Sequence, residues 1–192
     1  IRDVELGTGL PKLIIPIVEA EARHIFIQAR EYKYRQTDII EWRADFYHDV
    51  LDINAVLTTA KKLRKILGNI PILFTFRTPS QGGNTTITME QYHALNRAII
   101  ESGYVDAVDL EIDSDEHQGD ELIHAAHAHK VAIFGSRNYS DITPDKESIL
   151  RSMHKIQNLG VDIIKMATMA NSPADAIHLM DATQEMKATD AN

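Results

Sequence analysis

A lysine at the end of an apolar run is the residue of this chain best suited to covalent chemistry. Lys165 closes the stretch from Val161 to Ile164, where we expect a buried strand. Burial disfavours the ammonium form of a lysine, and a neutral amine can condense with a ketone or an aldehyde. Lys165 is therefore a candidate for a Schiff base. The plainer alternative is a strand-terminal lysine that extends its amine to water.

Other charged side chains also close apolar runs. Glu41 and Arg43 flank Trp42, so both should point to one side of a strand while Trp42 faces the other. Side by side, they would hold each other ionised and could bind a ligand rich in hydroxyls, or they could form a structural ion pair. Arg77 ends another run and precedes the Gly82-Gly83 pair, which indicates a ligand-facing loop. Two arginines and a lysine suit an anionic carbonyl compound.

Short apolar runs alternate with longer helical patterns along the 192 residues. Runs dense in Val, Ile, Leu and Phe are typical of strands buried on both faces of a parallel sheet. The predicted strands are Lys12–Val18, Asp38–Ala44, Pro71–Arg77, Val105–Ile112, Val131–Ser136 and Val161–Met166. The predicted helices are Ala20–Tyr34, Ile53–Leu67, Thr88–Glu101, Asp120–His129, Asp145–Leu159 and Ala174–Lys187.

This pattern of βα units fits either an open doubly wound sheet or a closed barrel. The first βα turn, from Pro16 to Glu21, has none of the glycines that a dinucleotide-binding sheet needs. The candidate charges instead recur at the carboxyl ends of several strands, as in barrel active sites. We therefore predict an α/β fold, a (β/α)8 TIM-type barrel, in a single domain over residues 1–192. Only about six units are present, so we expect the last two to be missing and two sheet edges to be open or covered by a partner.

Composition excludes several classes of partner and location. A net charge of −8 argues against nucleic acid or an anionic membrane as a partner. No apolar stretch is long enough to span a bilayer, no secretory leader opens the sequence, and cysteine is absent, so we expect a cytoplasmic protein. His124, His127 and His129 lack a well-placed carboxylate or cysteine to complete a metal site. We expect them on a solvated helix, with no metal bound.

Together these segments resemble the type I 3-dehydroquinate dehydratases of the shikimate pathway. The matching pieces follow the family's order across essentially the whole chain: Pro11-Lys12, Pro16-Ile17, Glu41-Trp42-Arg43 with Asp45, Phe74 to Thr78, Gly82-Gly83, Val108 to Glu111, Thr143-Pro144 and Lys165 to Met169. The resemblance implies a (β/α)8 barrel and a lyase that converts 3-dehydroquinate to 3-dehydroshikimate in aromatic amino acid biosynthesis. We expect a homodimer without a cofactor.

The resemblance also assigns roles to particular residues. It implies that Lys165 forms an imine with the C3 ketone of the substrate, and that Glu41, Arg43 and Arg77 bind the ring hydroxyls and the carboxylate. Among Asp106, Asp109 and Glu111 of the fourth strand, we expect Glu111 to reach this site. The family's last two units, which carry a further arginine and a closing loop, are those we expect to be missing.

One catalytic position departs from the family. A histidine before the Thr-Pro dipeptide serves as its general acid and base, but here Asn138 or, in a shifted alignment, Arg137 takes that place. Asparagine cannot carry a proton near neutral pH. The acid that partners the histidine corresponds to Gln81, a change that some members tolerate, and we expect Gln81 to be among the substrate-binding residues. The alternatives are an impaired or silent member that binds the substrate, or another lysine-imine barrel enzyme such as a class I aldolase.

Overall fold

The computed structural model describes residues 1–112 and 119–189. Six parallel strands form one sheet in the order β1-β2-β3-β4-β5-β6. The strands are β1 Ile14–Ile17, β2 Ile39–Arg43, β3 Ile72–Thr75, β4 Ala107–Glu111, β5 Ala132–Tyr139 and β6 Ile163–Thr168. The helices are α1 Ala22–Tyr32, α2 Ile53–Leu67, α3 Met89–Glu101, α4 Gly119–Ala128, α5 Lys146–Asn158 and α6 Pro173–Thr189, with short 3-10 helices η1 Ala44–Phe46 and η2 Pro79–Gln81.

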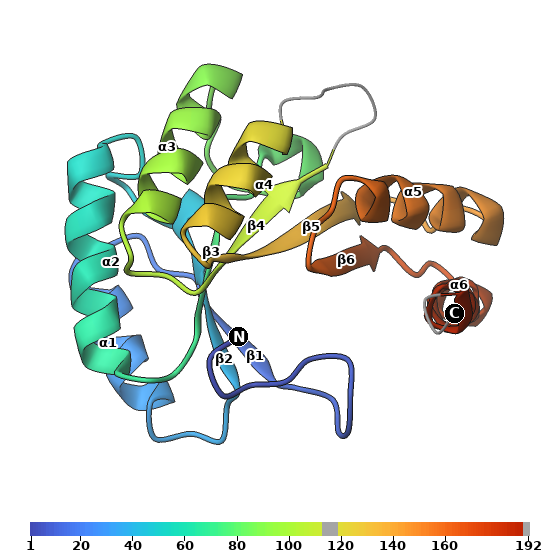
Figure 1. Ribbon diagram of the computed structural model, residues 1–192, viewed down its shortest axis with the longest axis horizontal. Coiled ribbons are helices and arrows are strands. Elements are labelled where there is room, and N and C mark those ends of the chain that lie inside the picture. The colour runs from blue at the N-terminus through green and yellow to red at the C-terminus, as the bar shows by residue number, and fades with distance from the viewer. Residues whose placement is uncertain (113–118, 190–192) are drawn as a thin grey trace.

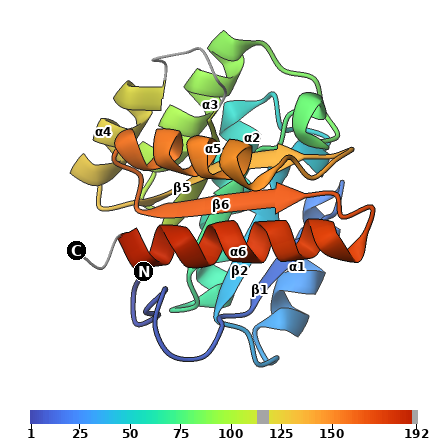
Figure 2. The same cartoon turned by 90° about the vertical axis from the view of Figure 1, so that its right-hand side faces the viewer.

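The strand order decides between the two architectures. A doubly wound sheet reverses its order at a switch point, whereas these strands follow one another without reversal. The sheet curls into part of a barrel, with α1 to α5 along its outer face (Figure 1) and α6 running beside β6 (Figure 2). The barrel prediction is therefore confirmed. Within the described residues, β1 and β6 each pair with one neighbour and form the edges of the sheet.

The outer face of the sheet packs against the helices in the main core. Trp42 is fully buried there, with its ring 5.5 Å from that of Phe74 in a nearly perpendicular arrangement. Large aromatic side chains bury much apolar area and pack in few orientations. The predicted outward direction of Trp42 is confirmed, and it fixes which residues of β2 face inward.

Glycines and an aspartate mark several helix ends. Gly68, Gly103 and Gly160 follow the ends of helices with positive φ values of 63°, 71° and 78°, which glycine adopts at little steric cost. At the start of α5, however, Asp145 is the cap, because its carboxylate accepts a hydrogen bond from Ser148 N at 2.8 Å. The nearby Thr143 hydroxyl does not cap the helix and donates to the carbonyl of Met169.

The lower part of the inner face is apolar and covered. Its buried cluster consists of Ile39, Leu73, Ala107 and Phe134, against which the N-terminal Ile1, Val4 and Leu6 pack.

In the described part of the chain, no helix is both long and apolar enough to cross a membrane.

Candidate active site

Directly above the apolar cluster, the inner face of the sheet becomes polar. Successive strands each contribute one side chain to this layer: Glu41 from β2, Thr75 from β3, Asp109 from β4, Ser136 from β5 and Lys165 from β6. Residues two apart in a strand share a face, so each of these lies two positions beyond a residue of the apolar cluster or of its partly buried rim. We call these five residues the polar layer.

Lys165 lies between two carboxylates of this layer. Its Nζ is 3.0 Å from Glu41 Oε1 and 3.0 Å from Asp109 Oδ2, and its side chain is 31% exposed. The apolar surroundings expected from the sequence are therefore absent, and the amine is held by two charge-assisted hydrogen bonds rather than extended into water. It remains accessible from the open side of the sheet.

Asp109, which sequence reasoning passed over in favour of Glu111, is the residue that joins Lys165 to Arg77. It is fully buried, and its carboxylate accepts from Arg77 Nη2 at 2.8 Å and from Ser136 Oγ at 2.5 Å as well as from Lys165. The signal that could have found it is a carboxylate at an inward position within the apolar strand Val108 to Glu111. A buried carboxylate of this kind needs charged partners.

Glu111 is the last residue of β4, and it anchors the loop that follows β3. It accepts hydrogen bonds from Thr78 N and Thr78 Oγ1, at 2.8 and 2.7 Å, and from Arg77 Nη1 at 3.2 Å. Burial raises the pKa of Glu111, although the Thr78 hydrogen bonds and the charge of Arg77 offset part of that effect. Glu111 therefore reaches the site through Arg77, whereas Asp109 is the carboxylate of β4 that contacts Lys165. Asp106 lies at the other end of β4, where it pairs with Arg2 and Arg64.

Arg77 is almost completely buried, at 4% exposure, and remains a cation. Burial alone would lower its pKa, but the neighbouring charges of Asp109 and Glu111 outweigh burial, so the pKa of Arg77 is raised. Its Nη1 also donates to Ser136 Oγ at 2.8 Å. The arginine predicted to bind an anion is thus fixed in position beside the lysine.

Arg43 has a different partner from the one predicted. Its Nε and Nη2 donate to the two oxygens of the fully buried Asp45, at 2.8 and 2.9 Å. Glu41 instead accepts from Thr75 Oγ1 at 2.7 Å and from Lys165. The predicted Glu41–Arg43 ion pair is wrong, because Asp45 offers the guanidinium a two-point acceptor.

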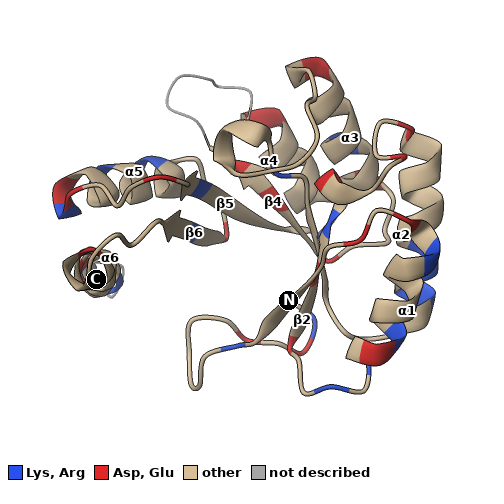
Figure 3. Cartoon of the chain, turned by 180° about the vertical axis from the view of Figure 1, so that it is seen from behind, with Lys and Arg blue, Asp and Glu red and all other residues tan. Residues whose placement is uncertain are grey.

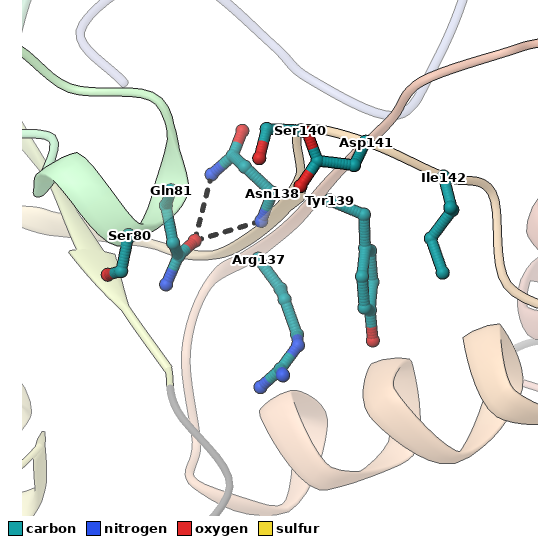
Figure 4. Close-up of a pocket in the computed structure, with 8 residues that line it drawn as sticks. All are labelled: Ser80, Gln81, Arg137, Asn138, Tyr139, Ser140, Asp141 and Ile142. Carbon is teal, nitrogen blue, oxygen red and sulfur yellow. Dashed lines mark hydrogen bonds between the residues drawn. The ribbon is translucent and has the colours of Figure 1, made fainter.

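Asn138 lies on the inner side of β5, two residues beyond Ser136. Its backbone N and its Nδ2 both donate to Gln81 Oε1, at 2.9 and 3.2 Å (Figure 4). Arg137 lies on the opposite side of the strand, with its guanidinium 5.1 Å from the centre of the Tyr139 ring. Of the two residues that the sequence left open, Asn138 is the one on the same side of the sheet as Lys165.

A hollow of about 230 Å³ lies beside this amide pair. Its lining residues are Ser80, Gln81, Arg137, Asn138, Tyr139, Ser140, Asp141 and Ile142 (Figure 4). Lys165 does not line it, because the polar layer lies lower on the inner face. The hollow therefore marks the rim of the candidate site rather than the position of its amine.

The three neighbouring histidines lie on and just after α4. His127 Nε2 is 3.1 Å from Asp162 Oδ2, and both side chains are more than 40% exposed. Over residues 1–112 and 119–189, no group of three or more His, Asp or Glu side chains is placed to hold a metal ion. The expected absence of a metal stays a prediction.

The fold and the polar layer define the class of protein: an α/β barrel with an accessible lysine among buried charges at the carboxyl ends of its strands. Comparison with known proteins defines it further. The family model described as Type I 3-dehydroquinase matches residues 13–192. The chain belongs to the type I 3-dehydroquinase family, as the resemblance of its motifs predicted.

Named relatives and solved structures agree with this assignment. The 3-dehydroquinate dehydratase of Escherichia coli O17:K52:H18 is 39% identical over 187 residues, which cover 97% of this chain and 74% of the relative. The type I 3-dehydroquinate dehydratase of Clostridium difficile, determined with covalently modified comenic acid, superposes with a TM-score of 0.94 at 35% identity, over 97% of this chain and 73% of that one. The 3-dehydroquinate dehydratase of Geobacillus kaustophilus gives the same TM-score at 35% identity, over 98% and 73% of the two chains.

Proposed function

We propose that this chain is a lyase that dehydrates 3-dehydroquinate to 3-dehydroshikimate through a Schiff base on Lys165. The observation that carries the proposal is the position of Lys165 Nζ, 3.0 Å from both Glu41 and Asp109 in a layer that also holds Arg77. Membership of the family supports the choice of substrate.

The first step is formation of the imine. The ammonium group must lose a proton before it can attack, and Glu41 and Asp109 are both within hydrogen-bond distance to accept it. The amine nitrogen then bonds to C3 of the ketone, and loss of water from the adduct gives a protonated imine. The two carboxylates would stabilise the positive nitrogen, because they already lie where that charge forms.

The second step is elimination. The protonated imine draws electrons from the ring, so a water molecule in the site can accept the C2 proton and leave an enamine; the C1–O bond then breaks, and the C1 hydroxyl takes up a proton from water and leaves as water. Addition of water to the C=N bond releases 3-dehydroshikimate and restores Lys165. The water consumed here matches the water lost on imine formation, so the net change is the loss of one water from the substrate.

The remaining residues bind and orient the substrate in this proposal. Arg77 and Arg43 supply guanidinium groups suited to a carboxylate and to ring hydroxyls. Gln81 and Asn138, both at the rim, present amide groups to the ligand or to a water molecule. Asn138 occupies the place of the family's proton carrier without being able to carry a proton.

A second candidate function follows from Asn138 alone. Without a general acid and base at this position, the chain would bind the substrate, and even form the imine, while turning it over slowly. Loss of such a group lowers rates by about 10²–10⁴-fold. This candidate differs from the first in rate rather than in ligand.

Turnover separates a lyase that uses Lys165, whether fast or slow, from a chain that only binds the substrate. We would follow formation of the conjugated product by its ultraviolet absorbance. The full chain would be compared with the Lys165→Met variant and with the matched control Lys61→Met, which replaces an exposed lysine on α2. Product formed by the wild type and by Lys61→Met, but not by Lys165→Met, supports the lyase. Absence of product from the wild type would reject the lyase and favour the binding function.

A further inference from the structure

A second hollow lies on the outer side of β5, where α5 covers it. Its volume is about 270 Å³, and its lining residues are Ile112, Arg137, Tyr139, Ser148, Arg151, Ser152, Lys155 and Ile156. The strand alternation that turns Asn138 toward the inner face turns Arg137 and Tyr139 outward into this hollow. We call this hollow the outer pocket; it shares Arg137 and Tyr139 with the hollow at the rim, while the sheet separates it from the polar layer.

The outer pocket concentrates positive charge on an acidic chain. Arg137, Arg151 and Lys155 line it, and no carboxylate is among its described lining residues, although the chain carries a net charge of −8. Arg151 and Lys155 are one turn apart on α5, where like charges destabilise a helix. Figure 3 shows basic residues on α5 and on the neighbouring end of β5. This concentration of positive charge would favour a bound anion.

Hydroxyl groups complete the lining and are held in place by one another. Tyr139 OH lies 3.0 Å from Ser152 Oγ, and Ser152 Oγ lies 3.0 Å from the Ser148 carbonyl. Arg151 Nη2 donates to Ser148 Oγ at 2.7 Å, and the guanidinium of Arg137 lies over the Tyr139 ring. These contacts orient the polar groups around the outer pocket before any ligand binds, which reduces the entropy lost on binding.

We propose that the outer pocket binds the dianion of a phosphomonoester or of inorganic phosphate. Guanidinium groups match phosphate oxygens in pairs, and the hydroxyls can donate to the remaining oxygens. A phosphoryl group carries a charge of about −1.5 to −2 near neutral pH, which suits three cations better than the single charge of a carboxylate does. The anion would compete with the contacts that Arg137 and Lys155 already make. This proposal does not depend on the lyase activity.

Calorimetric titration of the full chain tests it. Inorganic phosphate, glycerol 3-phosphate and acetate would be titrated at constant ionic strength into the wild type, the double variant Arg151→Gln/Lys155→Gln and the control Lys61→Gln/Lys65→Gln. Both variants remove two exposed charges spaced four residues apart on a helix. We expect phosphate affinity to fall by at least about tenfold in the α5 variant, because charge-assisted hydrogen bonds are lost. The control should retain its affinity for phosphate.

Other results of the titrations would overturn the phosphate site or identify its ligand. Equal weakening in both double variants would show a general charge effect and overturn the proposal, as would no binding of either phosphate by the wild type. Acetate bound as tightly as phosphate would contradict the choice of ligand. Tighter binding of glycerol 3-phosphate than of inorganic phosphate would support an organic phosphomonoester, and equal binding the phosphate group alone. Loss of phosphate binding in Lys165→Met would place the anion in the polar layer and overturn the outer pocket.

Discussion

At the scale of single residues, the candidate site depends on a buried carboxylate that serves two cations. Asp109 is fully buried and contacts both Lys165 and Arg77, so its charge compensates theirs in a place that water does not reach. The position of the amine therefore depends on β4, which carries Asp109, as much as on β6, which carries Lys165. Glu41, the second carboxylate that contacts the amine, also accepts from Thr75.

Replacing Asp109 by asparagine tests this role. Removing one partner of a buried ion pair costs about 3–5 kcal/mol, because the remaining charges lose their compensation. Ser136→Ala is the matched control, since Ser136 is equally buried and contacts the same carboxylate but is neutral; a typical hydrogen bond contributes about 0.5–1.5 kcal/mol. Urea unfolding of both variants measures the difference. Equal losses of unfolding free energy would contradict the role given to Asp109.

Restoring a proton carrier at position 138 should raise turnover. In Asn138→His, combined with Gln81→Glu to give the imidazole an acidic partner, we expect a gain of about 10²–10⁴-fold. The pH profile of kcat should also gain a limb near the ordinary histidine pKa of about 6.5. Asn138→Ala, which adds no titrating group, serves as the control. An unchanged rate in the double variant would mean that Asn138 does not occupy the position of the general acid and base.

Glu111 should give stability a pH dependence of a known sign. Its pKa is raised above the ordinary value of a glutamate, so between that value and the raised one the folded state binds more protons than the unfolded state. Its contribution to stability is therefore greatest below this window and falls as pH rises through it. Relative to the wild type, Glu111→Gln should gain unfolding free energy as the pH rises, in urea titrations across the acidic range. A shift in the opposite direction would contradict the raised pKa.

Much of the site could be predicted residue by residue. Lys165, Glu41 and Arg77 were found because each is a charge inside or at the end of an apolar strand, and the structure brings them into one layer. Their pairing could not be predicted, because it depends on where each strand sits relative to its neighbours. That register puts Asp109 rather than Glu111 beside Lys165, and η1, which no periodicity indicated, gives Asp45 to Arg43.

At the scale of elements, the loop after β3 depends on close contact with its own backbone. Gly83 N donates to Thr78 O at 2.8 Å, and a Cβ on Gly83 would lie 1.8 Å from the Arg77 carbonyl oxygen. The neighbouring Gly82 has a positive φ of 84° but open space around it. The sequence predicted a ligand-facing loop here. The structure shows a short helix within this loop, η2, which carries Gln81 to Asn138.

The two glycines therefore predict different costs. Gly82→Ala should cost about 1–2 kcal/mol, the penalty of a left-handed conformation. Gly83→Ala should cost more, because the backbone must move to remove the clash, and it should displace Gln81 and Thr78 with it. Thermal unfolding of both variants measures which substitution costs more stability. Impaired substrate binding by Gly83→Ala alone would support the displacement of Gln81 and Thr78. A smaller cost for Gly83→Ala than for Gly82→Ala would contradict this account.

The strands and helices themselves were predicted well, because both periodicities are strong. α2 has the predicted bounds, Ile53–Leu67, since Asp52 caps it and Gly68 ends it. β5 is longer than predicted and reaches Tyr139, because its last residues pair with β6 although their sequence is polar. Pairing with a neighbouring strand overrode the local composition.

At the scale of the whole molecule, the sheet has two edges in its described part, at β1 and β6. Exposed edges and apolar side chains favour association with another chain. On α6, Ile177 and Met180 lie one turn apart and are 62% and 72% exposed. The homodimer expected from the sequence thus stays a proposal with physical support, and the cytoplasmic location stays a prediction.

Light scattering coupled to size exclusion tests the homodimer. The expected mass is twice the chain mass of 21.6 kDa. The double variant Ile177→Lys/Met180→Lys should shift the mass toward one chain if α6 contributes to the interface, while Lys61→Gln/Lys65→Gln on α2 should leave it unchanged. A wild-type mass of one chain, independent of concentration, would reject the dimer.

The most direct test of the central claim is covalent trapping of the imine. The protein would be incubated with 3-dehydroquinate and reduced with borohydride, and the modified peptide would be located by mass spectrometry. We predict one adduct per chain, on Lys165, absent from Lys165→Met and retained in Asn138→Ala. An adduct on another lysine, or none on Lys165, would contradict the assignment of Lys165 as the amine that binds the substrate.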